Sequence, residues 1–559
     1  MILSTQIKGV FSANQTAAQA IVTCMKNEGV NKVFCVPGES YLPLLDALYD
    51  EPSIDVISAR HEGGAAFMAE GYAKASLKPG IVLATRGVGA TNLSIGVHTA
   101  YQDSTPMVVF LGQVDSRFRG REGFQEVDLE QYFAPIAKWA VEIKHPERVP
   151  EIVSRAFHIA RSGRPGPVVI SLPEDVLPKV GQMIFYPVMN VPKPAPSQRE
   201  VHEIKRILAE ARHPLIIAGG GVKLASAEEA LLSFAEKNQL PVMASFRRHD
   251  VFPNDHPLYV GHLGLGTNKE VLRTVAEADV ILAIGTRLSE VTTQDYQLIT
   301  RDHRLIHIDI SFDTIGKVFV PELAVISDAK EALERLLDVK LSPQWHDWVD
   351  ERNQAVRKSC SLQVSEKDVI NKHIIKEMVN SLPIDALITN DAGNFAGWLH
   401  SFYPFKEKHT YVGPTSGAMG YGLPAAIGAK LAYPNKTVVS LSGDGGFMMT
   451  VQELETAVRY NIPIIALVFN NQSYGTIRMH QEMVYPHRVM ATDLGATSFS
   501  ELAKSVGAYG YCVETIQEFE NALNNALEHN HMTVIEILTD VEHISVNITI
   551  EDLRKKTLR

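Results

Sequence analysis

Two hydrophobic patterns alternate along most of this chain. Short runs of apolar and β-branched residues predict buried strands, and stretches with an apolar residue at every third or fourth position predict helices. The first part of the chain combines the helix-like Ala17–Glu28 with several strand-like runs. These runs are Lys32–Val36, Ile54–Ser58, Ile81–Thr85, Met107–Leu111 and Val168–Leu172. Such alternation is typical of a parallel sheet with helices on both faces.

The same alternation returns twice further along the chain. The Pro-rich Tyr186–Ser197 cannot continue the first unit and predicts an extended linker. The strand-like runs beyond it are Leu215–Ala218, Pro241–Ala244, Val280–Ile284 and Leu305–Ile310, and then Ala386–Thr389, Thr437–Ser442, Ile464–Phe469 and Thr533–Ile537. Between these two sets lie the amphipathic Ala329–Leu337 and the polar, helix-prone Trp345–Lys367. We therefore predict an α/β chain with three doubly wound parallel-sheet domains, at residues 12–185, 198–340 and 368–550.

Length and composition agree with a multidomain globular protein. The chain has 559 residues, 45% of them hydrophobic and 21% charged, which is too long for one core and ordinary in composition. The net charge of −11 and the lack of a dense basic cluster argue against nucleic-acid or anionic-membrane partners. The cysteines form no CxxC pair, and no stretch has a signal peptide's pattern or the roughly 18 apolar residues of a membrane span. We therefore expect a cytoplasmic protein.

The segment after the predicted strand Thr437–Ser442 carries a candidate phosphate site. It reads Gly443-Asp444-Gly445-Gly446, and Thr450-Val451-Gln452-Glu453 then predicts an N-capping box that opens a helix. Glycines let the backbone approach a ligand, and a helix start presents free amides to an anion. Gly-Asp-Gly alone also occurs in surface turns. Together with the helix start, the segment predicts a diphosphate-binding loop.

A second predicted strand, Ile464–Phe469, brings a metal ligand to the same place. It ends in Asn470-Asn471-Gln472-Ser473. Because parallel strands end at the same edge of a sheet, Asp444 and Asn471 can meet there. One carboxylate, one amide oxygen and a backbone carbonyl, for which Ser473 is the candidate, suit Mg²⁺ when diphosphate oxygens and water complete the shell.

These motifs resemble those of thiamine diphosphate (ThDP) enzymes, and the likeness is greatest to the acetolactate synthase (acetohydroxyacid synthase) family. The segments that carry it are Ala59–Ala73, Thr85–Leu93, Ala100–Val114, Ser162–Val176 and Ser416–Ala429. The resemblance implies a pyrimidine-binding first domain, a Rossmann-like central domain and a diphosphate-binding last domain. It implies as cofactor-binding residues Glu62, Gly417, Met419, Gly443, Asp444, Gly445, Gly446, Asn471, Ser473, Tyr474 and Gly475.

Glu62 matches the family's glutamate that contacts the pyrimidine ring nitrogen. A buried carboxyl there can favour the tautomer that removes the thiazolium proton. An acid in the first turn of a helix is also favoured by the helix dipole alone, and the match to the last domain decides for catalysis. The resemblance places Met419 beneath the cofactor and the carbonyl of Gly417 beside it, although methionine is also an ordinary packing residue.

Further residues follow from the same resemblance. Gln113 matches a glutamine beside the thiazolium ring, and Phe124-Gln125-Glu126 matches an acceptor-side loop. For Gln125, a solvated loop amide is an equally good interpretation. The family's cofactor bridges two chains, which implies a homodimer or homotetramer that binds a small 2-keto acid or 2-hydroxyketone.

Two positions depart from the family pattern. His480 stands where biosynthetic synthases have a tryptophan, so a flat apolar wall has become a titratable one. The surrounding stretch also resembles benzaldehyde lyase. In Val36-Pro37-Gly38-Glu39, the last residue replaces a glycine and resembles the Pro-Gly-acid of pyruvate decarboxylases. Glu39 is therefore either a second active-site acid or base, or an exposed turn residue.

The central domain raises the question of a flavin. Gly219-Gly220-Gly221-Val222 and His307-Ile308-Asp309 are compatible with a dinucleotide. The Met-His-Gly and Asp-Asp-Arg of the flavin-binding synthases are replaced by Leu265-Gly266-Thr267 and Ser289-Glu290-Val291. A lone glycine run is weak evidence, so FAD stays open and is not favoured.

We therefore expect a ThDP- and Mg²⁺-dependent carboligase or lyase of 2-keto acids. Decarboxylation of pyruvate or a related acid would be followed by addition of the resulting enamine to a second carbonyl. The candidate catalytic residues are Glu62, Gln113, Glu39 and His480. The alternatives are a decarboxylase, or a benzaldehyde-lyase-like lyase, with a substrate other than pyruvate. A flavin-dependent oxidoreductase or a non-catalytic cofactor-binding protein is less favoured.

Overall fold

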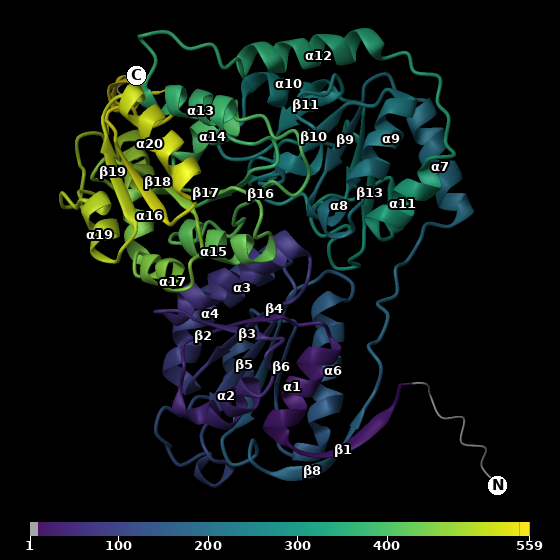
Figure 1. The fold of residues 1–559 in the computed structure, drawn as a ribbon. Helices are drawn as coiled ribbons and strands as arrows, with labels where there is room; N and C mark the ends of the chain where they lie inside the picture. Colours follow the sequence, from purple (N-terminus) through teal and green to yellow (C-terminus); the bar gives the residue numbers. More distant parts are fainter. Residues whose placement is uncertain (1–8, 547, 558–559) are drawn as a thin grey trace. The chain divides into compact units, whose positions relative to one another are not determined.

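The computed structural model describes residues 9–546 and 548–557. It contains three six-stranded parallel sheets flanked by helices, together with one antiparallel strand pair (Figure 1). The predicted α/β class with three parallel sheets is confirmed. Within the described ranges, no helix is long and apolar enough to cross a membrane.

The first sheet has the strand order β3-β2-β4-β5-β7-β6. Its strands are β2 (Lys32–Cys35), β3 (Asp55–Ser58), β4 (Gly80–Ala84), β5 (Met107–Gln113), β6 (Trp139–Glu142) and β7 (Pro167–Pro173). The helices between them are α1 (Ala17–Asn27), α2 (Leu42–Tyr49), α3 (Glu62–Ser76), α4 (Arg86–Asp103), α5 (Leu129–Phe133) and α6 (Val149–Arg161). The chain leaves β2 toward β3 on one side and returns to β4 on the other, which creates a topological switch point between β2 and β4.

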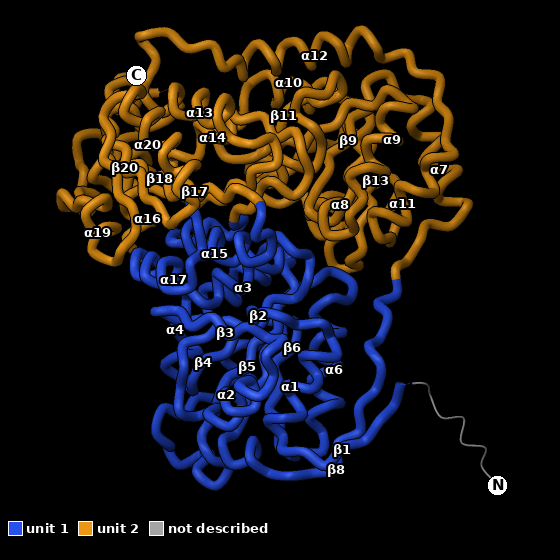
Figure 2. The backbone as a smooth tube through the Cα atoms, in the orientation of Figure 1, with its two compact units in different colours: residues 1–192, 414–435, 450–464 blue, residues 193–413, 436–449, 465–559 orange. Residues whose placement is uncertain are grey.

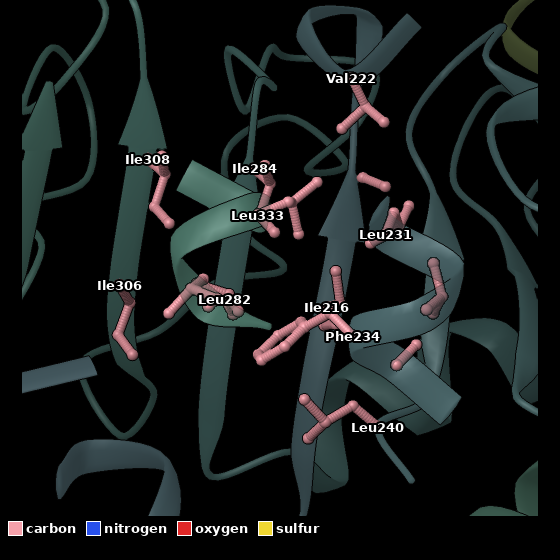
Figure 3. Packing of buried hydrophobic residues seen from close by; sticks show 14 of the residues in the cluster. Ile216, Val222, Leu231, Phe234, Leu240, Leu282, Ile284, Ile306, Ile308 and Leu333 are labelled. Carbon is pink, nitrogen blue, oxygen red and sulfur yellow. The ribbon is translucent and has the colours of Figure 1, made fainter. Parts of the chain in front are cut away.

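The central sheet has the order β11-β10-β9-β12-β13-β14. Its strands are β9 (Pro214–Ala218), β10 (Val242–Ala244), β11 (Tyr259–His262), β12 (Val280–Ile284), β13 (Arg304–Asp309) and β14 (Leu323–Ile326). The accompanying helices are α7 (Gln198–Ala209), α8 (Gly220–Leu224), α9 (Glu228–Asn238), α10 (Lys269–Glu277), α11 (Ala329–Leu336) and α12 (His346–Ser359). Figure 3 shows one side of this sheet packing against Phe234 of α9 and Leu333 of α11, and every labelled side chain is buried.

The third sheet has the order β16-β15-β17-β18-β20-β19. Its strands are β15 (Leu387–Asn390), β16 (Tyr411–Val412), β17 (Val438–Gly443), β18 (Ile465–Asn470), β19 (Tyr509–Val513) and β20 (Thr533–Leu538). The helices of this part are α13 (Ile370–Ser381), α14 (Ala396–Phe402), α15 (Gly422–Ala432), α16 (Asp444–Met449), α17 (Glu453–Arg459), α18 (Gly475–Val484), α19 (Phe499–Ser505), α20 (Ile516–His529) and α21 (Ile550–Thr557).

The backbone divides into two compact units that do not follow the three sheets one by one (Figure 2). Unit 1 consists of residues 1–192, 414–435 and 450–464. Helices α15 and α17, although they come from the last third of the chain, therefore belong to unit 1. Unit 2 consists of residues 193–413, 436–449 and 465–559, and contains the central and third sheets. Within unit 1, α15 packs closely on α3, because a Cβ at Gly428 would lie 2.0 Å from the carbonyl oxygen of Met68. The exact boundaries of the three predicted domains stay predictions.

The antiparallel pair joins the two ends of the first part of the chain. Strand β1 (Phe11–Thr16) pairs with β8 (Val180–Phe185), and neither strand was expected from the sequence pattern. Residues 186–197 then form neither helix nor strand, as the prolines predict. The predicted linker is therefore confirmed.

Unit 2 contains a cluster of three neighbouring histidines. The ring of His249 lies 4.3 Å from that of His262 and 4.4 Å from that of His400, measured between centroids. His249 is buried, and its Nε2 has no hydrogen-bond partner. Burial and the neighbouring histidines hold the pKa of His249 well below its usual value, and desolvation lowers the pKa of His262 to about 4. The fold therefore requires these rings to be neutral.

This cluster predicts that acid destabilises unit 2. The histidines titrate near 6.5 when unfolded and at lower pH when folded. The stabilising contribution of the neutral histidines to the free energy of unfolding is therefore complete above pH 6.5. It is lost as the pH falls toward 4, because the unfolded chain binds protons at a higher pH than the folded chain does. Replacing His249 by Phe should reduce the pH dependence of the unfolding free energy over this range by up to about 1.4 kcal/mol per pH unit. Urea unfolding at several pH values measures it. The same replacement at the exposed His98 should leave the slope unchanged; equal effects would refute this explanation.

Candidate functional site

The candidate diphosphate loop lies in unit 2, where β17 runs directly into α16. The helix begins at Asp444, and the N–H of Gly445 donates to the Asp444 side chain at 2.9 Å. A Cβ at Gly445 would lie 2.5 Å from the ring of Tyr474, and one at Gly446 would lie 2.7 Å from the carboxylate of Asp391. Both glycines are therefore required by close packing, because a side chain at either position would collide with its neighbour.

The predicted capping box after this loop is wrong. The helix that follows, α17, has Gln452 at its N-cap and no side-chain cap. The hydroxyl of Thr450 instead donates to the carbonyl of Gly420. The Glu453 carboxylate accepts the backbone N–H groups of Arg60 and His61, which lie just before α3. The spacing matched a capping box, but tertiary contacts within unit 1 use both side chains.

Asp444 and Asn471 meet at one backbone amide. The N–H of Ser473 donates to Asp444 Oδ2 and to Asn471 Oδ1, each at 3.2 Å. The Ser473 hydroxyl donates to the carbonyl of Thr492 at 3.1 Å, and the Ser473 carbonyl accepts the N–H of Gly475 at 2.8 Å. Burial raises the pKa of Asp444, although backbone amides oppose this. Two oxygen ligands of different kinds therefore converge at the edge where β17 and β18 end.

These residues fit the predicted diphosphate and Mg²⁺. A buried carboxylate with a raised pKa is stabilised by a cation, and an amide oxygen beside it is a ligand that Mg²⁺ accepts. In the part of the chain that the structure describes, no group of three or more His, Cys, Asp or Glu side chains could hold a metal ion. An Asp–Asn pair is a different kind of site, because it depends on oxygens of the bound diphosphate and on water.

In unit 1, Glu62 is the first residue of α3. The helix is capped by His61, whose Nδ1 accepts the N–H of Gly63 at 3.0 Å. The Glu62 carboxylate is partly buried and accepts a hydrogen bond from Asn92 Nδ2 at 2.9 Å. Helix α4 passes close by, since a Cβ at Gly89 would lie 3.2 Å from Glu62 Oε1. Glu62 is thus held at the carboxyl edge of the first sheet with one oxygen bonded.

Glu453 holds the backbone that leads into Glu62, a role that the sequence pattern did not predict. Its fully buried carboxylate accepts the N–H groups of Arg60 and His61, the two residues before Glu62, at 3.1 to 3.3 Å. It also accepts the hydroxyl of Thr456 at 2.7 Å, and burial raises its pKa. A local sequence pattern cannot predict this contact, because Glu453 lies almost 400 residues after Arg60 and His61 in the chain.

Two glutamines of unit 1 have different surroundings. Gln113, at the end of β5, is fully buried, and its amide donates to the carbonyl of Val127 and accepts the N–H of Val114. Gln125 has a positive φ of 65°, and its carbonyl accepts the N–H of Gly87 at 3.0 Å. These contacts hold the backbone of Gln125, and both interpretations of its side-chain amide stay open.

The predicted residues Gly417 and Met419 lie in the turn before α15. Gly417 is exposed with φ of 70°, and Met419 is partly buried. The hydrogen bond from Thr450 to Gly420 ties this turn to the segment before α17, within unit 1.

The two residues that depart from the family pattern are both accessible. The Glu39 side chain is 68% exposed and pairs with Arg86 Nη1 at 3.2 Å. His480 is exposed on α18, whereas Met479 on the same helix packs against Ile544, Ile550 and Leu553. The buried Glu482 of α18 accepts a hydrogen bond from Arg554 of α21 at 2.9 Å. Helix α21 therefore holds α18 through Met479 and Glu482, and the His480 side chain stays exposed.

The glycine run of the central domain has a packing reason. A Cβ at Gly219 would lie 2.3 Å from the carbonyl oxygen of Gly285, and one at Gly221 would lie 2.6 Å from Gly285 Cα. These segments follow β9 and β12, so the backbones touch at the switch point of the central sheet. The glycines therefore give no separate support for FAD.

The contact of Glu453 yields a prediction. Replacing Glu453 by Ala removes the carboxylate that accepts the N–H groups of Arg60 and His61, and because hydrogen bonds to charged groups are strong, this should lower the unfolding free energy by about 1–3 kcal/mol. The hydrogen-exchange rates of the amides of residues 60–64 should increase more than those of the rest of α3. The matched control is Glu455→Ala on the same helix, whose carboxylate pairs only with Arg459 among the interactions described. Equal exchange in the two variants would contradict the role of Glu453.

Family models match all three parts of the chain. The N-terminal TPP-binding, central and C-terminal TPP-binding domains of thiamine pyrophosphate enzymes match residues 15–132, 201–336 and 391–537. The chain is 35% identical to the probable acetolactate synthase large subunit of Methanocaldococcus jannaschii, over 94% of this chain and 92% of that protein. It is 34% identical to the acetolactate synthase large subunit of Lactococcus lactis, over 95% and 93% of the two chains. For the isozyme 3 large subunit of Escherichia coli, identity is 32% over 95% and 96%. The chain therefore belongs to the acetolactate synthase family of thiamine-diphosphate-dependent enzymes.

Proposed function

We propose that this protein is a ThDP- and Mg²⁺-dependent carboligase that acts on 2-keto acids. Pyruvate or a related acid loses CO₂, and the remaining acyl unit is added to the carbonyl carbon of a second molecule. The observation that carries the proposal is the convergence of Asp444 and Asn471 on the N–H of Ser473, in a chain of this family. The relatives named acetolactate synthase large subunit support the reaction class.

Each proposed residue has a defined task. Asp444, Asn471 and the carbonyl of Ser473 would hold Mg²⁺, and the first amides of α16 would hold the diphosphate. Glu62 would share a proton with the pyrimidine ring nitrogen, and its hydrogen bond from Asn92 fixes the carboxylate for that purpose. When bound, ThDP supplies the carbon nucleophile and the electron sink of the reaction. Gln113 ends β5 of the first sheet, the sheet that also positions Glu62, and would contact the substrate without adding a charge. Glu39 and His480 are the proposed acid–base groups near the substrate.

A second candidate function is a decarboxylase, or a lyase of bulkier 2-hydroxyketones. It is favoured by one observation, the exposed imidazole of His480 on α18. A titratable ring at that position can protonate or deprotonate a substrate that a synthase would only pack against. A flavin-dependent oxidoreductase is disfavoured, because close backbone packing already explains the glycines of the central domain.

We also propose that at least two chains associate. The family resemblance implies that Glu62 of one chain and Asp444 of another bind the same cofactor molecule. A homodimer, or a homotetramer built from two such dimers, would satisfy this requirement.

Incubating the purified protein with pyruvate, ThDP and Mg²⁺ tests the proposal. We expect CO₂ and acetolactate, and Glu62→Gln should lower both by at least about 100-fold, because general acid–base catalysis typically contributes that much. Glu51→Gln, a half-buried acid of the same unit that pairs with Lys26, is the matched control and should retain activity. Turnover of benzoin-type ketones with pyruvate inert would select the second candidate. Full activity of Glu62→Gln would refute the role of Glu62.

A further inference from the structure

A charged cluster spans the switch point of the first sheet. Glu39 follows β2 and Arg86 follows β4; the two strands are parallel neighbours, and the chain continues from β2 to β3 on one side and from β4 to β5 on the other. The hydroxyls of the adjacent residues Ser40 and Thr85 lie 2.7 Å apart. In open α/β sheets, ligands bind in the crevice outside the carboxyl ends of the strands at this point.

Arg86 is held firmly at this switch point. The residue is only 7% exposed, and its Nη2 lies 2.7 Å from Glu174 Oε2, at the end of β7. Its backbone has φ of 25°, a conformation that costs a non-glycine residue roughly 1–3 kcal/mol and is concentrated at functional sites. The guanidinium carbon lies 5.9 Å from the centre of the Phe124 ring, which is 72% exposed. One side of the guanidinium is thus fixed, and its surroundings include an accessible aromatic ring.

The contact with Glu39 is weaker than the contact with Glu174. It measures 3.2 Å against 2.7 Å, and the Glu39 side chain is mostly exposed. Water screens the exposed carboxylate of Glu39, so its contact with Arg86 is the more easily replaced of the two. A carboxylate from a ligand can therefore replace that of Glu39 at Arg86 Nη1.

Arg86 also lies among the proposed catalytic groups of unit 1. The N–H of the next residue, Gly87, bonds to the carbonyl of Gln125. One turn further along α4, Gly89 approaches Glu62. Gln113 ends β5, the strand beside β4. A small carboxylate bound at Arg86 would therefore be close to the groups that the proposed reaction needs.

We propose that Arg86 binds the carboxylate of the acceptor 2-keto acid and so determines acceptor specificity. The inference rests on the proposed function. An arginine that held the donor's carboxylate would stabilise the group that must leave as CO₂, and so would oppose the reaction. The acceptor keeps its carboxylate: a new C–C bond forms at its carbonyl carbon, the C=O electron pair moves to oxygen, and that oxygen takes a proton.

A competition between two acceptors tests the assignment. With pyruvate as donor, a second pyruvate gives acetolactate, whereas added acetaldehyde, which has no carboxylate, gives acetoin. Arg86→Met should lower the ratio of acetolactate to acetoin by roughly 10- to 100-fold, which is the usual effect of losing a charge-assisted hydrogen bond. Arg86→Lys keeps the charge without the planar fork and should give an intermediate ratio.

Arg161→Met is the matched control. Arg161 ends α6 in the same unit, and its Nη2 lies 2.7 Å from Glu28 Oε2, the same contact that Arg86 makes with Glu174. Its ratio should equal that of the wild type. CO₂ release with an unchanged ratio in Arg86→Met would overturn the assignment, and if that variant does not fold, an unchanged ratio in Arg86→Lys would do so. No CO₂ from the wild type would instead overturn the proposed function, and this inference with it.

Discussion

The buried carboxylate of Asp444 sets the main constraint on this structure. A charge removed from water is costly unless polar partners surround it, and here backbone amides of Gly445 and Ser473 supply only part of the compensation. The register of β17 and β18 fixes where the rest comes from, because β17 ends at Gly443, opposite Phe469, and β18 ends one residue later at Asn470. Asn471 is thereby delivered beside Asp444. A divalent cation that also binds an anionic ligand would balance the charge of the Asp444 carboxylate, with Asn471 as a second oxygen ligand.

The three sheets use their switch points differently. In the first sheet, the crevice between β2 and β4 holds the ion pair of Glu39 and Arg86. In the third, the residues after β15 and β17 place Asp391 beside the loop that Asp444 opens. In the central sheet, the segments after β9 and β12 touch through glycine backbones. One topology therefore provides two crevices lined with charged side chains and one that is closed by backbone contact.

Sequence patterns predicted the inner strands well and the edges poorly. Continuous apolar runs such as Val280–Ile284 identify strands that are buried on both faces. The strands that were missed in the three parallel sheets all lie at or near an edge: β6, β11, β14, β16 and β19. Edge strands have less buried surface, so their patterns are mixed; β6 is only partly buried throughout, and β16 has two residues.

The candidate site divides in a similar way. Asp444 and Asn471 stand at strand ends, where parallel topology brings residues to a common edge, so local sequence was sufficient to single them out, whereas Glu62 was singled out only by the family resemblance. Glu453 and Arg86 were not found, because their roles depend on contacts with segments far away in the sequence. Thr450 and Glu453 had the spacing of a capping box, yet the contacts with Gly420 and with the approach to α3 use them instead.

The most direct measurement is the affinity for ThDP with and without Mg²⁺, determined by calorimetric titration of the wild type and of Asp444→Asn. The account predicts that Mg²⁺ tightens binding to the wild type at least about tenfold, since the metal joins the carboxylate to the diphosphate, and that Asp444→Asn loses most of this effect. Asp493→Asn, an exposed acid beside Ser473 that pairs with Arg478, should behave as the wild type. Equal ThDP affinity with and without Mg²⁺, or an Asp444→Asn variant that keeps the full metal dependence, would contradict the account.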